Sequence, residues 1–380
     1  MKAFVFTDKA LTSVAGQFAW LALDTEKATN AAAVEKYTVP AWPSFFIVDP
    51  RSETVLRRWT GGASVEQLVA FLADGRAALA SAAAASGTLA AKLAAADRLY
   101  GRGEYPAAAD AYAAAVAAAP AGWPELPRAT DAYLFSLQEA DRTEDCVRAA
   151  SELAPKIAAT ASYPNAVVTG LDCALSLAKS APARAALVAR FEKACREVLA
   201  DPKRQLAVDD RSGIYQELIG ARDDAGDGAA KKQLEGEWVA MLEKAAANAR
   251  TPEERTSFDP HRISAYLEIG QPERAVPMLE ASERDFPQDY NPPARLALAY
   301  NAMKQWDKAL AASDRALARA YGPRRLTILR YRVATYVGMG DKAAAKRTLE
   351  TAIHEAEALP AAQRSPRVLA ALHKQLAGLG

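Results

Sequence analysis

The feature that most constrains this chain is an internal repeat of 34 residues in its C-terminal third. Residues at matching positions are Tyr266, Gly270, Ala275 and Pro287, followed by Tyr300, Lys304, Ala309 and Tyr321, and three further matches follow at a spacing of 36 (Tyr336, Ala345 and Ile353). A period near 34 residues is the length of two antiparallel helices with their turns. One helix pair cannot bury its apolar face alone, so such pairs stack into a solenoid. The repeat therefore predicts a mainly α-helical chain.

The second helix of each predicted pair carries a small residue, a contact residue four positions on and another small residue seven positions on. These sets are Ala108, Tyr112, Ala115; Ala275, Leu279, Ser282; Ala309, Ser313, Ala316; and Ala345, Leu349, Ala352. Offsets of four and seven share one face of a helix, and small residues there let two helices approach closely. We expect these residues to lie buried between the helices of a pair. Cys146, Ala150 and Leu153 keep the same spacing, which predicts the Cys146 sulfur in such an interface.

Two stretches, 103–120 and 270–287, resemble the tetratricopeptide repeat. The resemblance implies a solenoid of tetratricopeptide-like helix pairs over residues 90–380. Its predicted parts are regular units near 90–120, 257–290, 291–324 and 326–358, degenerate repeats over 121–250, the regular part within 251–358, and a capping helix over 366–378. Thr251, Pro252 and Glu254 supply an N-cap, a proline in the first turn and a reaching carboxylate where the regular part begins.

The first 76 residues have a different pattern. Apolar runs at 18–24, 44–49 and 55–59 are typical of buried strands, and residues 30–37 of a helix. Residues 64–67 form a capping box that opens a helix through Leu72, and residues 77–89 are expected to be an Ala-rich connecting helix or linker. Strands and helices in this order predict a small α/β domain.

That order, together with the run from Val39 to Phe45, resembles the last two-thirds of a thioredoxin fold, and the opening residues resemble its periplasmic thiol-reductase branch. In that family a cis-proline stands where Pro43 does, and the equivalents of Trp42 and Pro43 present their backbone to an extended client peptide. A turn that merely positions the strand at Ser44 is the alternative. The resemblance thus implies a small, N-terminally incomplete thioredoxin-like domain over residues 1–76, which lacks the first strand and the catalytic CxxC pair.

The missing strand would leave a gap in the middle of the family's sheet, with unpaired backbone groups that are costly to bury. One interpretation is that Met1 is an internal methionine of a longer reading frame. The other is a natural domain that has lost its redox function. The chain as written is expected in the cytoplasm, and in the periplasm if a signal peptide precedes it.

Composition excludes several function classes. Lys and Arg number 47 against 46 Asp and Glu, so the net charge of +1 does not favour nucleic acid as a partner. Asp74 and Arg76 interrupt the longest apolar run, so no membrane insertion is expected. No motif indicates a metal, a cofactor or a catalytic residue. The basic stretch Arg324, Arg325, Arg330 and Arg332 is expected to be a solvated helix face, with phosphate contact as the alternative.

The chain has three cysteines, Cys146, Cys173 and Cys195. Their odd count and wide spacing argue against a disulfide framework, so they are expected to be small buried apolar residues. A thiol enzyme needs an accessible cysteine of low pKa, and none of the three is placed for that.

Two functions from different classes remain. The first is a non-enzymatic interaction scaffold, in which a redox-inactive thioredoxin-like module accompanies a peptide-binding solenoid. The second is a thiol:disulfide oxidoreductase whose CxxC lies upstream of Met1. In the resembling repeat family the first helices line the concave groove, which predicts Ser264, Leu267, Leu298 and Asn301 as partner-binding residues, together with Trp42 and Pro43. Packing of Leu267 against Leu298 between repeats is the alternative.

Overall fold

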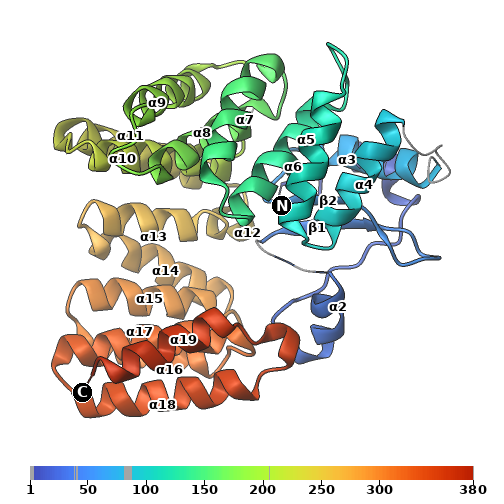
Figure 1. Ribbon diagram of the computed structural model, residues 1–380. Coiled ribbons are helices and arrows are strands. Elements are labelled where there is room, and N and C mark those ends of the chain that lie inside the picture. The colour runs from blue at the N-terminus through green and yellow to red at the C-terminus, as the bar shows by residue number, and fades with distance from the viewer. Residues whose placement is uncertain (1–3, 38, 40–41, 81–87, 205, 380) are drawn as a thin grey trace. The chain divides into compact units, whose positions relative to one another are not determined.

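The computed structural model describes residues 4–37, 39, 42–80, 88–204 and 206–379, and it is mostly helical (Figure 1). The chain divides into two compact units. Unit 1 comprises Met1–Phe18 and Thr38–Leu234, and unit 2 comprises Ala19–Tyr37 and Glu235–Gly380. A short N-terminal segment therefore belongs with the C-terminal helices. The domain boundaries expected near residues 76 and 90 do not coincide with this division and stay predictions.

Unit 1 begins with a small α/β module. Its elements are η1 (Lys9–Leu11), α1 (Thr12–Ala15), β1 (Ser44–Val48), β2 (Val55–Thr60) and α3 (Val65–Ala80). The strands pair antiparallel, with Ser44 opposite Thr60 and Phe45 opposite Trp59, and α3 packs against β2. Val5, Leu11, Ile47, Ala63, Leu68, Phe71 and Leu72 form its core. These residues confirm the two later strands and the helix predicted after them.

The predicted capping box opens α3. The Ser64 amide donates to Gln67 Oε1 at 2.7 Å, and the Gln67 amide donates to Ser64 Oγ at 3.2 Å. This reciprocal pair satisfies two of the amides that a helix start leaves open. The helix continues through Ala80, beyond the predicted end at Leu72, and residues 81–87 of the expected linker lie outside the described residues.

The strand expected at 18–24 is wrong. The segment has no regular structure, and the side chains of Trp20 and Leu21 are 46% and 83% exposed. A short apolar run forms a buried strand only where a sheet edge receives it, and the run alone does not show whether one does. Among the described residues the sheet consists of β1 and β2, which does not establish a thioredoxin-like fold. The helix predicted at 30–37 is present as η2 (Ala28–Asn30) and α2 (Ala31–Lys36).

The peptide bond between Trp42 and Pro43 is cis, as the resemblance implied. Pro40 and Ala41, which precede it in the quoted motif, lie outside the described residues.

Helix pairs follow the module throughout the rest of unit 1. They are α4 (Leu89–Gly101), α5 (Tyr105–Ala117), α6 (Leu126–Glu139), α7 (Thr143–Leu153), α8 (Tyr163–Ser176), α9 (Arg184–Ala200) and α10 (Val208–Asp224), with α11 (Gly228–Ala247) containing the division between the units. From α4 to α10 each helix packs on the next, and alternate helices also touch, α4 on α6, α6 on α8 and α8 on α10. That pattern is typical of stacked helix pairs.

A disulfide joins Cys146 of α7 to Cys173 of α8, and it corrects the expectation of three free cysteines. The small-residue face of α7 packs on α8, which brings the two Cα atoms to 6.1 Å, within the range that a disulfide spans. An odd cysteine count excludes only complete pairing, not one bridge. Cys195 is free and fully buried, as expected.

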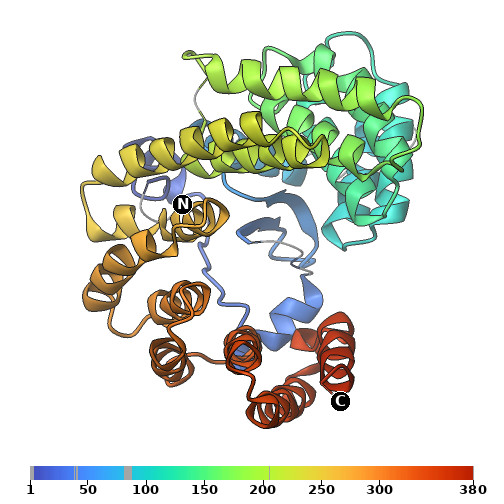
Figure 2. The same cartoon turned by 90° about the vertical axis from the view of Figure 1, so that its left-hand side faces the viewer.

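Unit 2 continues the pairs (Figures 1 and 2). Its elements are α12 (Pro252–Thr256), α13 (Asp259–Glu268), η4 (Pro272–Arg274), α14 (Ala275–Asp285), α15 (Asn291–Ala302), α16 (Trp306–Leu317), α17 (Pro323–Met339), α18 (Lys342–Ala358), η5 (Ala361–Gln363) and α19 (Pro366–Ala377). Thr251 caps α12 by accepting from the Glu254 amide, as predicted. Leu372 of α19 is buried against α17 and α18, so a packed helix is present where the capping helix was predicted, and its role as a cap stays a prediction.

The pattern of small and contact residues predicts the packing of the pairs correctly. Every member of the four sets is at most 1% exposed. Across the described residues, no helix is both long enough and apolar enough to cross a membrane.

Candidate functional site

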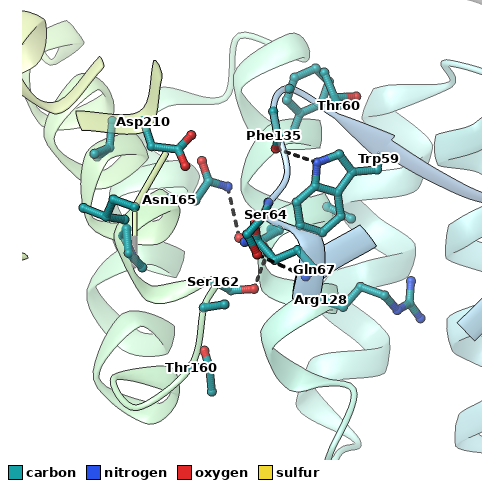
Figure 3. A pocket seen from close by; sticks show the side chains of 18 of the residues that line it. Trp59, Thr60, Ser64, Gln67, Arg128, Phe135, Thr160, Ser162, Asn165 and Asp210 are labelled. Carbon is teal, nitrogen blue, oxygen red and sulfur yellow. Dashed lines mark hydrogen bonds between the residues drawn. The ribbon is translucent and has the colours of Figure 1, made fainter. Parts of the chain in front are cut away.

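Unit 1 contains a cleft of about 790 Å³ that is lined by the first helix of each helix pair. The lining residues come from α4, α6, α8 and α10 and from the turn between β2 and α3 (Figure 3). Figure 3 shows Asn165 and Asp210 on the opposite side of the cleft from Trp59. A volume of this size falls within the range of small-ligand and peptide pockets, roughly 300–1,000 Å³.

The turn that walls the cleft is fixed by its own hydrogen bonds. Trp59 Nε1 donates to the Gly62 carbonyl at 2.9 Å, and the capping box holds Ser64 and Gln67. Gly61 has a φ of +95°, which favours glycine, and its amide donates to the Pro43 carbonyl at 2.8 Å. This wall is therefore preformed.

A buried ion network supports the floor of the cleft. The Asp97 carboxylate pairs with Arg128 at 2.9 Å and with Arg57 at 3.0 Å, and it accepts from Tyr112 Oη at 2.7 Å. Because both oxygens of Asp97 are engaged, we assign this network to the structure of the cleft rather than to ligand binding.

Asp131 and Asp210 are the exceptional carboxyl groups of the cleft. Asp131 accepts hydrogen bonds from Ser162 Oγ and, at 3.0 Å, from Asn165 Nδ2. Burial raises the pKa of Asp131 to about 6. Burial, with the Asp209 charge second, likewise raises the pKa of Asp210 to about 6. The described part of the chain provides no ion pair for either carboxylate.

The cleft's buried or half-buried arginines are occupied by protein groups. Arg204 donates to the carbonyls of Thr160 and Ala158 at 3.0 and 2.9 Å, and Arg58 donates to the Tyr100 carbonyl at 3.1 Å. The charged lining consists of Glu66, Asp97, Asp131, Asp201, Asp209, Asp210, Arg58, Arg128, Lys203 and Arg204. Carboxyl groups outnumber basic ones, so the cleft suits a ligand with a positive group. Among the described residues, no cluster of His, Cys, Asp or Glu could hold a metal ion.

None of the six residues expected to bind partners lines this cleft. Trp42 is 67% exposed, and the Pro43 carbonyl accepts the hydrogen bond from the Gly61 amide of the cleft wall. In unit 2, Ser264 is exposed and its hydroxyl donates to the Pro260 carbonyl, while Leu267 and Leu298 are half-buried.

Asn301, the last of the six, lies between two first helices. Its Nδ2 donates at 2.8 Å to the hydroxyl of Thr335 on α17, a residue that is 2% exposed. This contact gives Asn301 a packing role, and its predicted role in partner binding stays a proposal.

A signal in the sequence could have pointed to the cleft. Asp131 and Asn165 are hydrogen-bonded and lie 34 residues apart in the sequence. Gln138 and Asp172 have the same spacing, and Gln138 Nε2 donates to Asp172 Oδ2 at 2.7 Å. Polar residues at the repeat spacing on successive first helices mark side chains that meet across the stack.

No protein-family model matches this chain, and no curated protein matches it. Solved structures with similar helix arrangements include a tetratricopeptide repeat protein from Parabacteroides merdae, at 11% identity, 71% of this chain, 93% of that chain and a TM-score of 0.41. A second is the TPR2AB domain of yeast Sti1 in complex with pHSP90, at 12% identity, 76% and 98% coverage and a TM-score of 0.28. A third is human IFIT1 with m7Gppp-AAAA, at 12% identity, 83% and 74% coverage and a TM-score of 0.36. Such low scores carry no function across, and the exclusion of nucleic acid stays a prediction.

Proposed function

We propose that the chain is a non-enzymatic interaction scaffold that holds a segment of a partner protein in the cleft of unit 1. The observation that carries this proposal is the pair of half-buried carboxyl groups, Asp131 and Asp210, in a cleft with a preformed wall. A lysine or arginine side chain of the partner would place its charge near them, and Trp59 and Phe135 would contact the stem.

In this proposal the small α/β module is a docking element. The turn from Trp59 to Gln67 contributes one wall of the cleft. The exposed Trp42 lies two residues before the start of β1, the strand that pairs with β2. We propose that the module is redox-inactive in this chain, whether or not it descends from a thioredoxin. Ser264, Leu267, Leu298 and Asn301 remain proposed contacts of a second surface on α13 and α15.

The cysteines favour a scaffold over a thiol enzyme. Two of them form the Cys146–Cys173 disulfide, and burial raises the pKa of the Cys195 thiol to about 12. A nucleophilic cysteine needs an accessible thiolate. The oxidoreductase hypothesis would therefore require cysteines other than those of this chain.

The proposal is tested with an array of lysine- and arginine-containing peptides and with the variant Asp131→Asn/Asp210→Asn. We expect the wild type to bind a subset of these peptides and the variant to lose at least about tenfold in affinity. Glu139→Gln, which removes an exposed carboxylate from α6, is the matched control and should change little. Asparagine keeps the shape of the side chain, and circular dichroism checks the fold.

Binding should also depend on pH. The pKa of each carboxyl group in the free protein is about 6, so the ionised form that attracts a cation accumulates as the pH rises through that value. Affinity should rise from about pH 5 to about pH 7 and then level off, and the double variant should lose this dependence. Equal binding of neutral peptides, or equal affinity of the double variant, contradicts the proposal.

A further inference from the structure

Unit 2 binds a short acidic turn of its own chain. The turn consists of Asp24, Thr25, Glu26 and Lys27, and it belongs to the N-terminal segment that is grouped with unit 2. Asp24 Oδ1 accepts from the Glu26 amide at 2.9 Å, and Asn30 Nδ2 donates to the Asp24 carbonyl at 2.8 Å. These bonds fix the turn internally. In Figure 2 the blue segment with α2 lies beside the red end of the chain, and α2 contacts η5.

Side chains at the starts of α15 and α17 bind both carboxylates of the turn. Glu26 accepts from Tyr290 Oη at 2.5 Å and pairs with Arg324 at 2.9 Å, and its side chain is only 15% exposed. Asp24 Oδ2 accepts from the Tyr321 hydroxyl. Arg324 therefore departs from the solvated basic face that was expected for it.

The backbone of the turn is also bound by hydrogen bonds. Gln363 of η5 donates through Nε2 to the carbonyls of Thr25 at 2.8 Å and Lys27 at 3.0 Å. Gly322 leaves space for the turn, since a Cβ at this position would lie 2.0 Å from the Glu26 carbonyl oxygen. Lys27 Nζ lies 5.8 Å from the centre of the Tyr321 ring. Two carboxylates, two carbonyls and the close approach at Gly322 are thus recognised together.

Such a combination is more than an ordinary interhelical contact. A surface ion pair alone stabilises by about 0–1 kcal/mol and would not fix one conformation. Here Gln363, which is 8% exposed, donates its side-chain amide to main-chain carbonyls of the turn. The rings of Tyr290 and Tyr321 pack edge to face, and both hydroxyls donate to the carboxylates of the turn. The site recognises a shape and a charge pattern, as peptide-binding sites do.

We propose that Tyr290, Tyr321, Gly322, Arg324 and Gln363 form a recognition site for Asp-x-Glu turns, which the chain's own residues 24–26 occupy in cis. A partner protein that exposes such a turn binds unit 2 when it replaces the cis turn. The site is separate from the cleft of unit 1 and takes a ligand of opposite charge. The cis turn acts as a tethered competitor at high effective concentration, so only a partner with additional contacts displaces it.

The test uses the full-length variant Asp24→Ala/Glu26→Lys, which removes both carboxylates of the turn and sets a positive charge against Arg324. The probe is a fluorescent synthetic peptide with the sequence of residues 21–30. We expect the variant to bind this peptide at least about tenfold more tightly than the wild type does, because its site is vacated. A peptide with Asn and Gln in place of the two acids should not bind.

Two further variants assign the binding to the proposed site. Adding Arg324→Gln should abolish peptide binding, whereas adding Arg330→Gln, which removes an exposed arginine of the same helix, should leave it unchanged. No binding by a folded Asp24→Ala/Glu26→Lys variant, or binding that survives Arg324→Gln, overturns the proposal.

A second measurement does not depend on the folding of that variant. In the wild type, an excess of the acidic peptide should increase amide hydrogen exchange at residues 24–27, because it displaces the cis turn. The Asn/Gln peptide should have no effect. Unchanged exchange with the acidic peptide at millimolar concentration also overturns the proposal.

Discussion

The disulfide between Cys146 and Cys173 links α7 to α8 and joins residues with a sequence separation of 27. Closing a loop of this length in the unfolded chain stabilises the folded state by about 3.5 kcal/mol in the chain-entropy account. Reduction should therefore lower the free energy of unfolding by about this amount, measured by urea denaturation with and without dithiothreitol.

Two cysteine variants sharpen this prediction. Cys146→Ala should abolish the effect of the reductant, while Cys195→Ala should preserve it, because Cys195 is outside the bridge. Thiol titration of the oxidised wild type in denaturant should detect one thiol per chain, and three thiols would show that the bridge is absent.

Residue types alone could not reveal this bridge. The spacing of Cys146, Ala150 and Leu153 correctly predicts the buried position of the sulfur. Its partner depends on the register of α8 against α7, which is set by packing and not by local sequence. For the same reason Asp131 and Asp210 were missed: a carboxyl group becomes unusual only through burial and through the neighbours that tertiary packing brings.

At the scale of elements, α8 and α9 pack together where Gly170 faces Phe191. A Cβ at position 170 would lie 2.4 Å from the Phe191 ring, which is buried. Gly170→Ala should destabilise the protein by about 1–3 kcal/mol, since the ring has little room to move.

Gly220→Ala in α10 is the matched control. A Cβ there would meet no atom within 4 Å, so the alanine should stabilise the helix by up to about 1 kcal/mol. Thermal denaturation of both variants checks the sign, and equal shifts in one direction would contradict the packing of α8 against α9.

Helix pairs were predictable because their signal is periodic and local. The strand expected at 18–24 failed because burial of an apolar run depends on a receiving edge, and residues 19–37 instead belong with distant helices of unit 2. No pattern within the segment around Asp24 and Glu26 indicates Tyr290 or Gln363 as partners.

For the whole molecule, the environment of the cysteines predicts that the protein does not catalyse thiol–disulfide exchange. The chain should reduce the disulfides of insulin no faster than a variant in which Cys146, Cys173 and Cys195 are all serine, since no thiolate is accessible. A turbidity assay with thioredoxin as positive control measures the rate. Turnover that Cys195→Ser alone removes would show that this sulfur is reachable after all.

The contact between Glu26 and Tyr290 joins residues 264 positions apart, and this has a consequence for synthesis. A ribosome that adds about 5–20 residues per second needs roughly 15–50 s to proceed from one to the other. Throughout that interval the nascent chain displays Trp20, Leu21 and the acidic turn with their eventual neighbours not yet made. Gln363 is translated later still, so any product of premature termination would carry the turn permanently unmatched and available to the completed repeats of a neighbouring chain.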